Sequence, residues 1–157
     1  MPYYIRILGK NNESILPQDL RPKAHPAVLR VAQGTEDQWE QLILTHQSGQ
    51  EIALIEKHPV VEGQLGAEEL QEFIEEVGHY KPESSVTWLR GFLPTVKVIY
   101  AFQLLSGTDA DDGWTPLHSL YGAVWSHTGG ILQADDLPVV APGGATSETA
   151  LSIVKAP

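Results

Sequence analysis

The feature that most constrains the fold is an almost unbroken apolar run, TVKVIYAFQLLS, at Thr95–Ser106. Its only charge is Lys97, near the start. β-Branched and aromatic residues favour a strand over a helix, and Pro94 and Gly107 limit the run to the length of a strand. Successive apolar residues place hydrophobic side chains on both faces, so such a strand must be covered on both sides. We therefore predict that Thr95–Leu105 is the central strand of a sheet.

The chain before this run predicts a meander of short strands separated by turn residues. The predicted strands are Tyr3–Leu8, Val28–Ala32, Trp39–Thr45 and Glu51–Glu56. Three prolines between Glu13 and Pro26 argue against a regular element there longer than a helical turn near Gln18–Leu20. Lys57-His58-Pro59 is expected to end the last strand of the meander.

Three helices are predicted from the hydrophobic periodicity. The first begins near Gly66 and has an apolar stripe opposite a row of glutamates. The second spans Glu83–Leu93, and the third begins at Trp114-Thr115-Pro116, with Thr115 as its cap, and ends at Gly129-Gly130. Strands and helices in this order predict an α+β fold, a mostly antiparallel sheet with about three helices, in a single domain over residues 1–157.

From Leu137 onward the composition shifts to Pro, Gly, Ala, Ser and Thr. Leu137–Ala141 and Thr149–Lys155 could pair as a hairpin within the segment 137–157. The same segment could instead be loosely attached, or exchanged with a second copy of the chain to form a homo-oligomer.

Charge and composition exclude several classes of function. The chain has 20 acidic and 10 basic residues, a net charge of −10 and no cysteine. Such a charge disfavours nucleic acid as a partner, and the lack of cysteine excludes disulfides and thiolate chemistry. No apolar run is long enough to span a bilayer, and no secretion signal is evident. We therefore expect a cytoplasmic protein that has no membrane partner.

No catalytic or cofactor-binding motif is present. None of the six histidines has a metal-binding spacing, and glycine-rich nucleotide loops and serine elbows are absent. The acidic loop Asp109–Gly113 lacks the glycine and closing glutamate of a calcium-binding EF-hand. We therefore predict no catalytic residue, no metal ligand and no cofactor.

Two groups of residues remain as candidate sites. The first is the acidic face of the helix after Gly66, which could dock a basic protein, although such a face is also typical of a solvated helix. It consists of Glu68, Glu69, Glu72, Glu75 and Glu76. The second is a cleft between the third helix and the sheet, which could hold a small ligand or could simply be filled core. Its candidate lining residues are Tyr100, Trp114, His118, Tyr121, Trp125 and Asp135.

In size, acidity and lack of both cysteine and a catalytic signature, the chain resembles in general character the immunity proteins that neutralise bacterial toxins. The resemblance involves no specific motif, so no residue roles follow from it. Together with the acidic helix face, it suggests a non-enzymatic interaction protein, such as an inhibitor of this immunity type, that binds a basic protein partner. The alternative hypothesis is a small-molecule-binding protein or enzyme that uses the cleft around Trp114, Tyr121 and His118.

Overall fold

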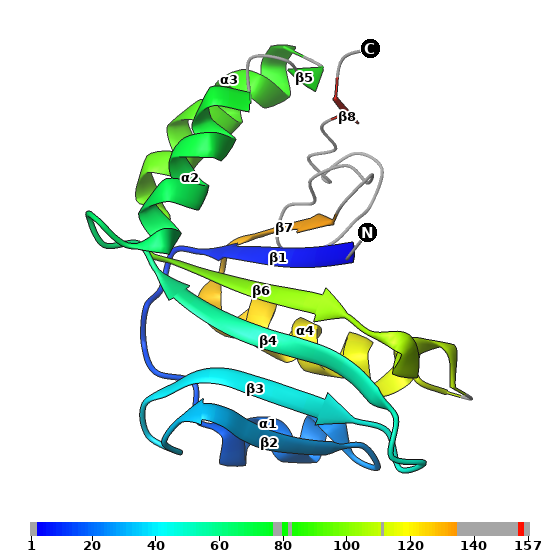
Figure 1. Cartoon of the computed structure of the whole chain (residues 1–157). Helices are drawn as coiled ribbons and strands as arrows, with labels where there is room; N and C mark the ends of the chain where they lie inside the picture. The colour runs from blue at the N-terminus through cyan, green and yellow to red at the C-terminus, as the bar shows by residue number, and fades with distance from the viewer. Residues whose placement is uncertain (1–2, 77–79, 82, 111, 135–153, 156–157) are drawn as a thin grey trace.

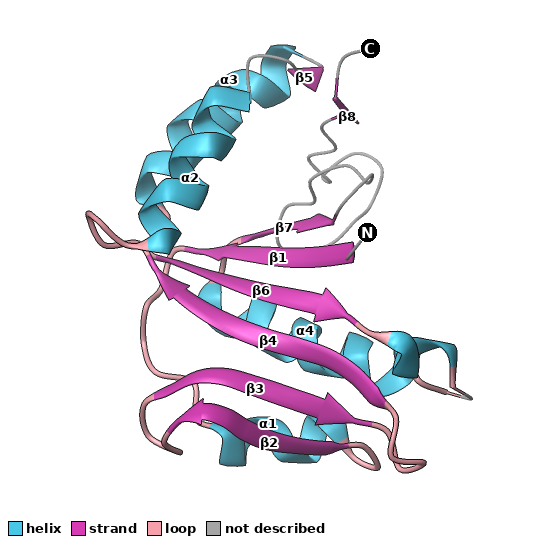
Figure 2. Ribbon diagram, in the orientation of Figure 1, coloured by secondary structure: helices cyan, strands magenta, loops and turns pink. Residues whose placement is uncertain are grey.

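A six-stranded antiparallel sheet forms the centre of the fold (Figures 1 and 2). The computed structural model describes residues 3–76, 80–81, 83–110, 112–134 and 154–155. The sheet strands are β1 (Tyr3–Gly9), β2 (Val28–Gly34), β3 (Trp39–Thr45), β4 (Glu51–Pro59), β6 (Val98–Leu104) and β7 (Ile131–Ala134). Their order across the sheet is β2-β3-β4-β6-β1-β7, and every pairing is antiparallel.

Helices lie on both faces of this sheet (Figure 1). They are α1 (Pro17–Ala24), α2 (Leu65–Glu76), α3 (Glu83–Phe92) and α4 (Trp114–Thr128), with short 3-10 turns at Leu93–Thr95 and Ser106–Asp109. α1 and α4 cover one face, whereas α2 and α3 stand against the other face near β1. The predicted α+β class is confirmed, and the described residues form four α-helices in place of about three.

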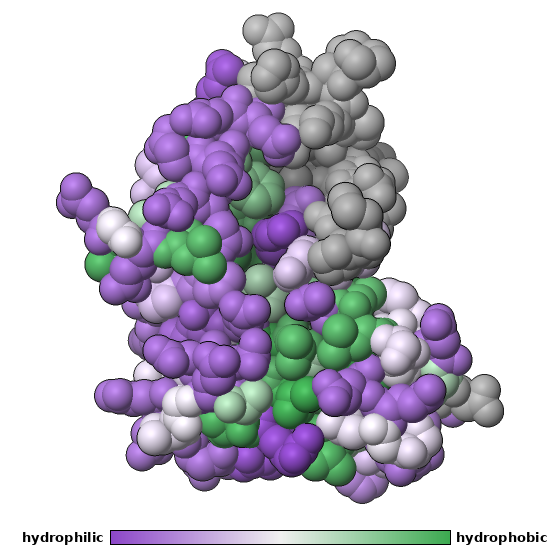
Figure 3. Space-filling model, in the orientation of Figure 1, coloured by the Kyte–Doolittle hydropathy of each residue, from purple (hydrophilic) through white to green (hydrophobic). Residues whose placement is uncertain are grey.

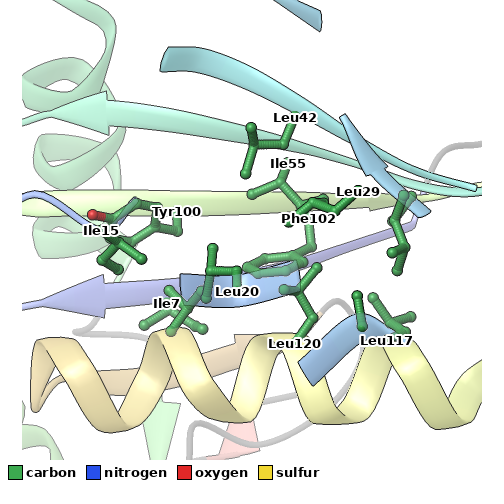
Figure 4. Packing of buried hydrophobic residues seen from close by; sticks show 14 of the residues in the cluster. Ile7, Ile15, Leu20, Leu29, Leu42, Ile55, Tyr100, Phe102, Leu117 and Leu120 are labelled. Carbon is green, nitrogen blue, oxygen red and sulfur yellow. The ribbon is translucent and has the colours of Figure 1, made fainter. Parts of the chain in front are cut away.

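The predicted central strand is β6, which lies inside the sheet between β4 and β1. Val98–Phe102 is buried without interruption. Tyr100 and Phe102 pack in the main core with Leu117 and Leu120 of α4 (Figure 4). The strand starts at Val98, three residues later than predicted, because Leu93–Thr95 forms a 3-10 turn that Val96 ends.

A second, smaller core lies on the opposite face, under α2 and α3. Ile99 of β6 points into it, so β6 is covered on both sides, as its sequence requires. The buried members of this cluster are Leu8, Leu70, Leu89, Leu93, Val96, Ile99 and Ile131. This cluster joins α2 and α3 to the sheet.

The prediction of no more than a turn in the proline-rich segment is wrong, because α1 spans Pro17–Ala24. Pro17 occupies the first helical turn, where a missing N–H leaves no hydrogen bond unmade. Leu20 and Ala24 stand four residues apart and are both buried in the main core. This packing offsets the hydrogen bond that Pro22 cannot make inside the helix.

The prediction that the third helix is capped by Thr115 is also wrong. α4 begins at Trp114 after Gly113, which makes no side-chain cap. Its predicted end is confirmed, since Gly129 takes the left-handed conformation that terminates the helix.

The prediction that Lys57-His58-Pro59 ends the meander is wrong, because β4 continues to Pro59. Lys57, His58 and Pro59 pair with Tyr100, Ile99 and Val98 of β6. Pro59 is tolerated because it is the last residue of the strand, where the ladder ends. The extension brings His58 onto the same face of the sheet as Glu56.

The chain returns near its end to the tip of the α2–α3 pair. β8 (Val154–Lys155) pairs with β5 (Tyr80–Lys81) in a two-stranded antiparallel sheet. The segment Leu137–Ala141, which the sequence offers as a hairpin partner for Thr149–Lys155, lies outside the described residues. None of the helices in the described ranges combines the length and the apolar character needed to cross a bilayer.

Candidate functional site

The predicted acidic surface lies on α2. Leu70 is buried and Phe73 and Ile74 are partly buried against the second core, so the positions on the opposite side of the helix face outward. Glu68, Glu72, Glu75 and Glu76 are exposed. In Figure 3 hydrophilic residues cover the visible side of this helix. We call these four glutamates the acidic surface.

The fifth predicted residue, Glu69, is not part of that exposed face. Its side chain is only 18% exposed, and it forms an ion pair with His58 Nδ1 of β4. Its Oε2 also lies 3.8 Å from Nε of Arg6 on β1. The helical period separates an apolar side from a polar side, but Glu69 stands at the border between them, where α2 meets the sheet.

His58 lies between two carboxylates. Its Nδ1 contacts Glu69, and its Nε2 lies 3.0 Å from Oε2 of Glu56. The ring is 14% exposed. The contact with Glu69 is the largest cause that raises the pKa of His58, Glu56 adds to it, and burial opposes it. A carboxylate at each ring nitrogen is matched only by the imidazolium, in which both nitrogens donate.

Arg6 extends this group across the sheet. Its Nη1 donates a hydrogen bond of 3.1 Å to Oε1 of Gln133 on β7, and its guanidinium lies 4.8 Å from the centre of the Tyr4 ring. Residues of β1, β4, β7 and α2 are thus joined in one polar group. We call it the latch cluster: Arg6, Glu56, His58, Glu69 and Gln133.

A shallow hollow of about 300 Å³ lies beside the latch cluster, between the end of β4 and the start of α2. Its lining includes Glu40, Glu56, Lys57, His58 and three glutamines. Burial lowers the pKa of Lys57. The lining mixes both signs of charge, so it favours neither a cationic nor an anionic ligand.

The latch cluster is better suited to joining elements than to catalysis. Each nitrogen of His58 already faces a carboxylate, so the ring cannot act as a general base without first breaking one of these contacts. In the described parts of the chain, no group of three or more histidine, cysteine or acidic side chains is arranged to hold a metal ion.

Three of the predicted cleft residues form a row along α4. The ring centres of Trp114 and His118 lie 5.3 Å apart, as do those of His118 and Tyr121. Tyr121 meets Phe102 of the core edge-on, whereas Trp114 and His118 are exposed. The row therefore runs over the outside of the helix.

The other predicted cleft residues lie apart from this row. Tyr100 is fully buried against Trp39, and burial raises its pKa to about 12. Trp125 donates a hydrogen bond of 2.8 Å to the carbonyl of Gly130 and so closes the end of α4. Asp135 lies outside the described residues.

Sequence reasoning missed Arg6, Glu56 and His58 as members of a site. The available signal was the spacing of Glu56 and His58, which places them on one face of a strand only if the strand continues past Glu56. Lys57-His58-Pro59 predicts a break in the strand, and this prediction hides the spacing. Comparison of the chain with protein-family models, with curated proteins and with solved structures found no match.

Proposed function

We propose that this protein is a non-enzymatic interaction protein that binds a basic protein partner through the acidic surface of α2. The supporting observation is that Glu68, Glu72, Glu75 and Glu76 are all exposed on a helix that contains no basic residue. Such a surface attracts a positively charged partner, speeds its approach and discriminates against acidic proteins.

An exposed apolar residue beside the glutamates supports a protein as the partner. Leu65 is 53% exposed and precedes Glu68 by three residues and Glu72 by seven, which places it on their side of the helix. Val61, just before the helix, is 47% exposed. Apolar side chains surrounded by charge are the usual composition of a protein interface.

The neighbouring sheet face offers further contact area. A stable interface needs roughly 800 Å² from each partner, which is more than one helix face provides. Ile43 of β3 and Leu54 of β4 are opposite each other in the sheet and are only partly buried. Apolar residues are visible on this part of the molecule, below α2 (Figure 3).

The fixed position of α2 also favours docking. The second hydrophobic cluster and the contacts of Glu69 hold the helix against the sheet before any partner arrives. A surface that is already ordered loses less conformational entropy on binding. An inhibitor of a basic toxin, as the general resemblance to immunity proteins suggests, is the most specific form of this proposal.

The test uses two variants with the same change of charge. One replaces Glu68, Glu72 and Glu75 by glutamine, and the other carries Glu13→Gln, Asp37→Asn and Glu51→Gln at exposed positions outside α2. A partner captured by the wild-type chain is identified, and its association rate is then measured at two ionic strengths. We expect the α2 variant to associate roughly tenfold more slowly at low salt, with a smaller difference at high salt.

The control variant should associate at nearly the wild-type rate. Equal slowing by the two variants would mean that only net charge matters, and no slowing by either would leave the α2 glutamates as solvated surface. Either result would contradict the proposal.

A further inference from the structure

Among the described residues, α2 is attached to the sheet by a small apolar contact and by the polar contacts of Glu69. Leu70 is its one buried large apolar side chain, and Phe73 and Ile74 are partly buried. Glu69 reaches His58 on β4 and Arg6 on β1. The protonation state of His58 therefore affects a substantial part of what holds α2 in place.

The two carboxylates that face His58 are both matched only when its ring is protonated. Glu56 faces it from β4 itself, Glu69 faces it from α2, and Arg6 on β1 contacts Glu69. From β6, the residue opposite His58 is the apolar Ile99. Lys57 and Glu40, of opposite charge, line the same hollow. Two carboxylates thus face the ring of His58, and only the imidazolium presents an N–H to both of them.

Loss of one proton to solvent would disrupt one of the two carboxylate contacts. The neutral ring keeps a single N–H, so its other nitrogen presents a lone pair to a carboxylate oxygen. If the N–H stays on Nδ1, the contact with Glu69 loses the attraction between opposite charges; if it stays on Nε2, two acceptors face each other where the His58 and Glu69 side chains are only 14% and 18% exposed. Either tautomer therefore holds Glu69 less firmly than the imidazolium does.

We propose that His58 is a protonation-dependent latch, which fixes α2 to the sheet when its ring is charged and holds the Glu69 side of the helix less firmly when the ring is neutral. The latch itself concerns only the free protein. Its consequence for binding rests on the proposed function: the acidic surface is held in a binding-ready position at mildly acidic pH and becomes less ordered as the pH rises through the pKa of His58 in the folded protein.

The first test needs no variant. NMR titration of the His58 ring is combined with amide hydrogen exchange of α2 between pH 6 and pH 9, corrected for the intrinsic pH dependence of exchange. Protection of α2 should fall with the same midpoint as the His58 titration, by roughly tenfold for each pH unit by which the His58 pKa exceeds its ordinary value. Protection of β6 should stay constant. If the amide protection of α2 did not change as His58 titrates, the proposed latch would be wrong.

Variants then separate charge from packing. His58→Arg keeps a cation at every pH in the range, so its α2 protection should be flat. Glu69→Gln removes the main partner and should also abolish the pH dependence. His118→Gln, at an exposed histidine of α4, should behave as the wild type does. A wild-type pH dependence in the Glu69 variant would contradict the proposal.

Failure of the latch and failure of the proposed function give different results. The exchange experiment contains no partner, so it tests the latch alone. The kinetic comparison of the glutamine variants, carried out at pH 6 where the latch is closed, tests the acidic surface alone.

Discussion

Phe102 has no exposed surface and lies in the main core between β6 and α4 (Figure 4). Phe102→Ala should lower the free energy of unfolding by roughly 3–5 kcal/mol, because it removes buried apolar surface and leaves a cavity. Denaturant unfolding measures this change. Leu65→Ala, at a half-exposed position, is the control and should stay within about 0.5 kcal/mol of the wild type. A loss below about 1 kcal/mol for Phe102→Ala would contradict the described core.

Gly66 and Gly122 should respond oppositely to the same substitution. At Gly66, where α2 begins, an added Cβ would meet the carbonyl oxygens of His58 and Pro59, whereas at Gly122 in α4 nothing lies within 4 Å of it. Gly66→Ala should therefore destabilise by about 1–3 kcal/mol, and Gly122→Ala should stabilise by up to about 1 kcal/mol. Denaturant unfolding of both variants and of the wild type measures these changes in stability. If both substitutions changed the free energy of unfolding in the same direction, α2 would not pack closely on β4.

At the scale of elements, the attachment of α2 to β4 should make stability depend on pH. Because the pKa of His58 is raised in the folded state, its contribution is complete below the ordinary value of about 6.5 and is lost as the pH rises through the folded value. The difference in unfolding free energy between the wild type and His58→Gln should therefore shrink from pH 6 to pH 8.5. Denaturant unfolding at several pH values measures it, with His118→Gln as the control. A difference that grows with pH would reverse the sign of this contribution.

Most elements could be predicted because their signals are local. The period of Leu70, Phe73 and Ile74 predicts α2, and the apolar run ending at Leu105 predicts β6. α1 could not be predicted, because its stability depends on packing of Leu20 in a core built from distant strands. A local pattern contains no information on such packing.

The exposed glutamates of the candidate site could be predicted from the sequence, whereas the contacts of Glu69 could not, for a similar reason. Helical periodicity predicts the exposure of Glu68 and Glu72 but does not say which edge of the polar side meets the sheet. The burial of Glu69 and its contact with His58 depend on how β4, β6 and β1 pair, with Glu56 opposite Ala101 and Ala101 opposite Arg6. Pairing between strands so distant in the chain leaves no periodic signal in a single sequence.

At the scale of the whole molecule, the acidic surface should matter little for stability. Glu68 and Glu72 are four residues apart and repel each other, so replacing Glu68, Glu72 and Glu75 by glutamine removes repulsion without exposing core. We expect a melting temperature within a few degrees of the wild-type value. Thermal unfolding followed by circular dichroism measures it. A large drop would mean that these glutamates stabilise the fold, and their substitution could then no longer test binding separately.

The place of β1 in the sheet has a consequence for synthesis of the chain. β1 lies between β6 and β7, and its first partner follows it by on the order of a hundred residues. The meander β2–β4 can pair as it leaves the ribosome, but Ile5, Ile7 and Leu8 stay unburied until β6 has also emerged. A nascent chain halted before Val98 should therefore be open to proteases and chaperones. It should become resistant only when β6 and β7 have emerged and have paired with β1.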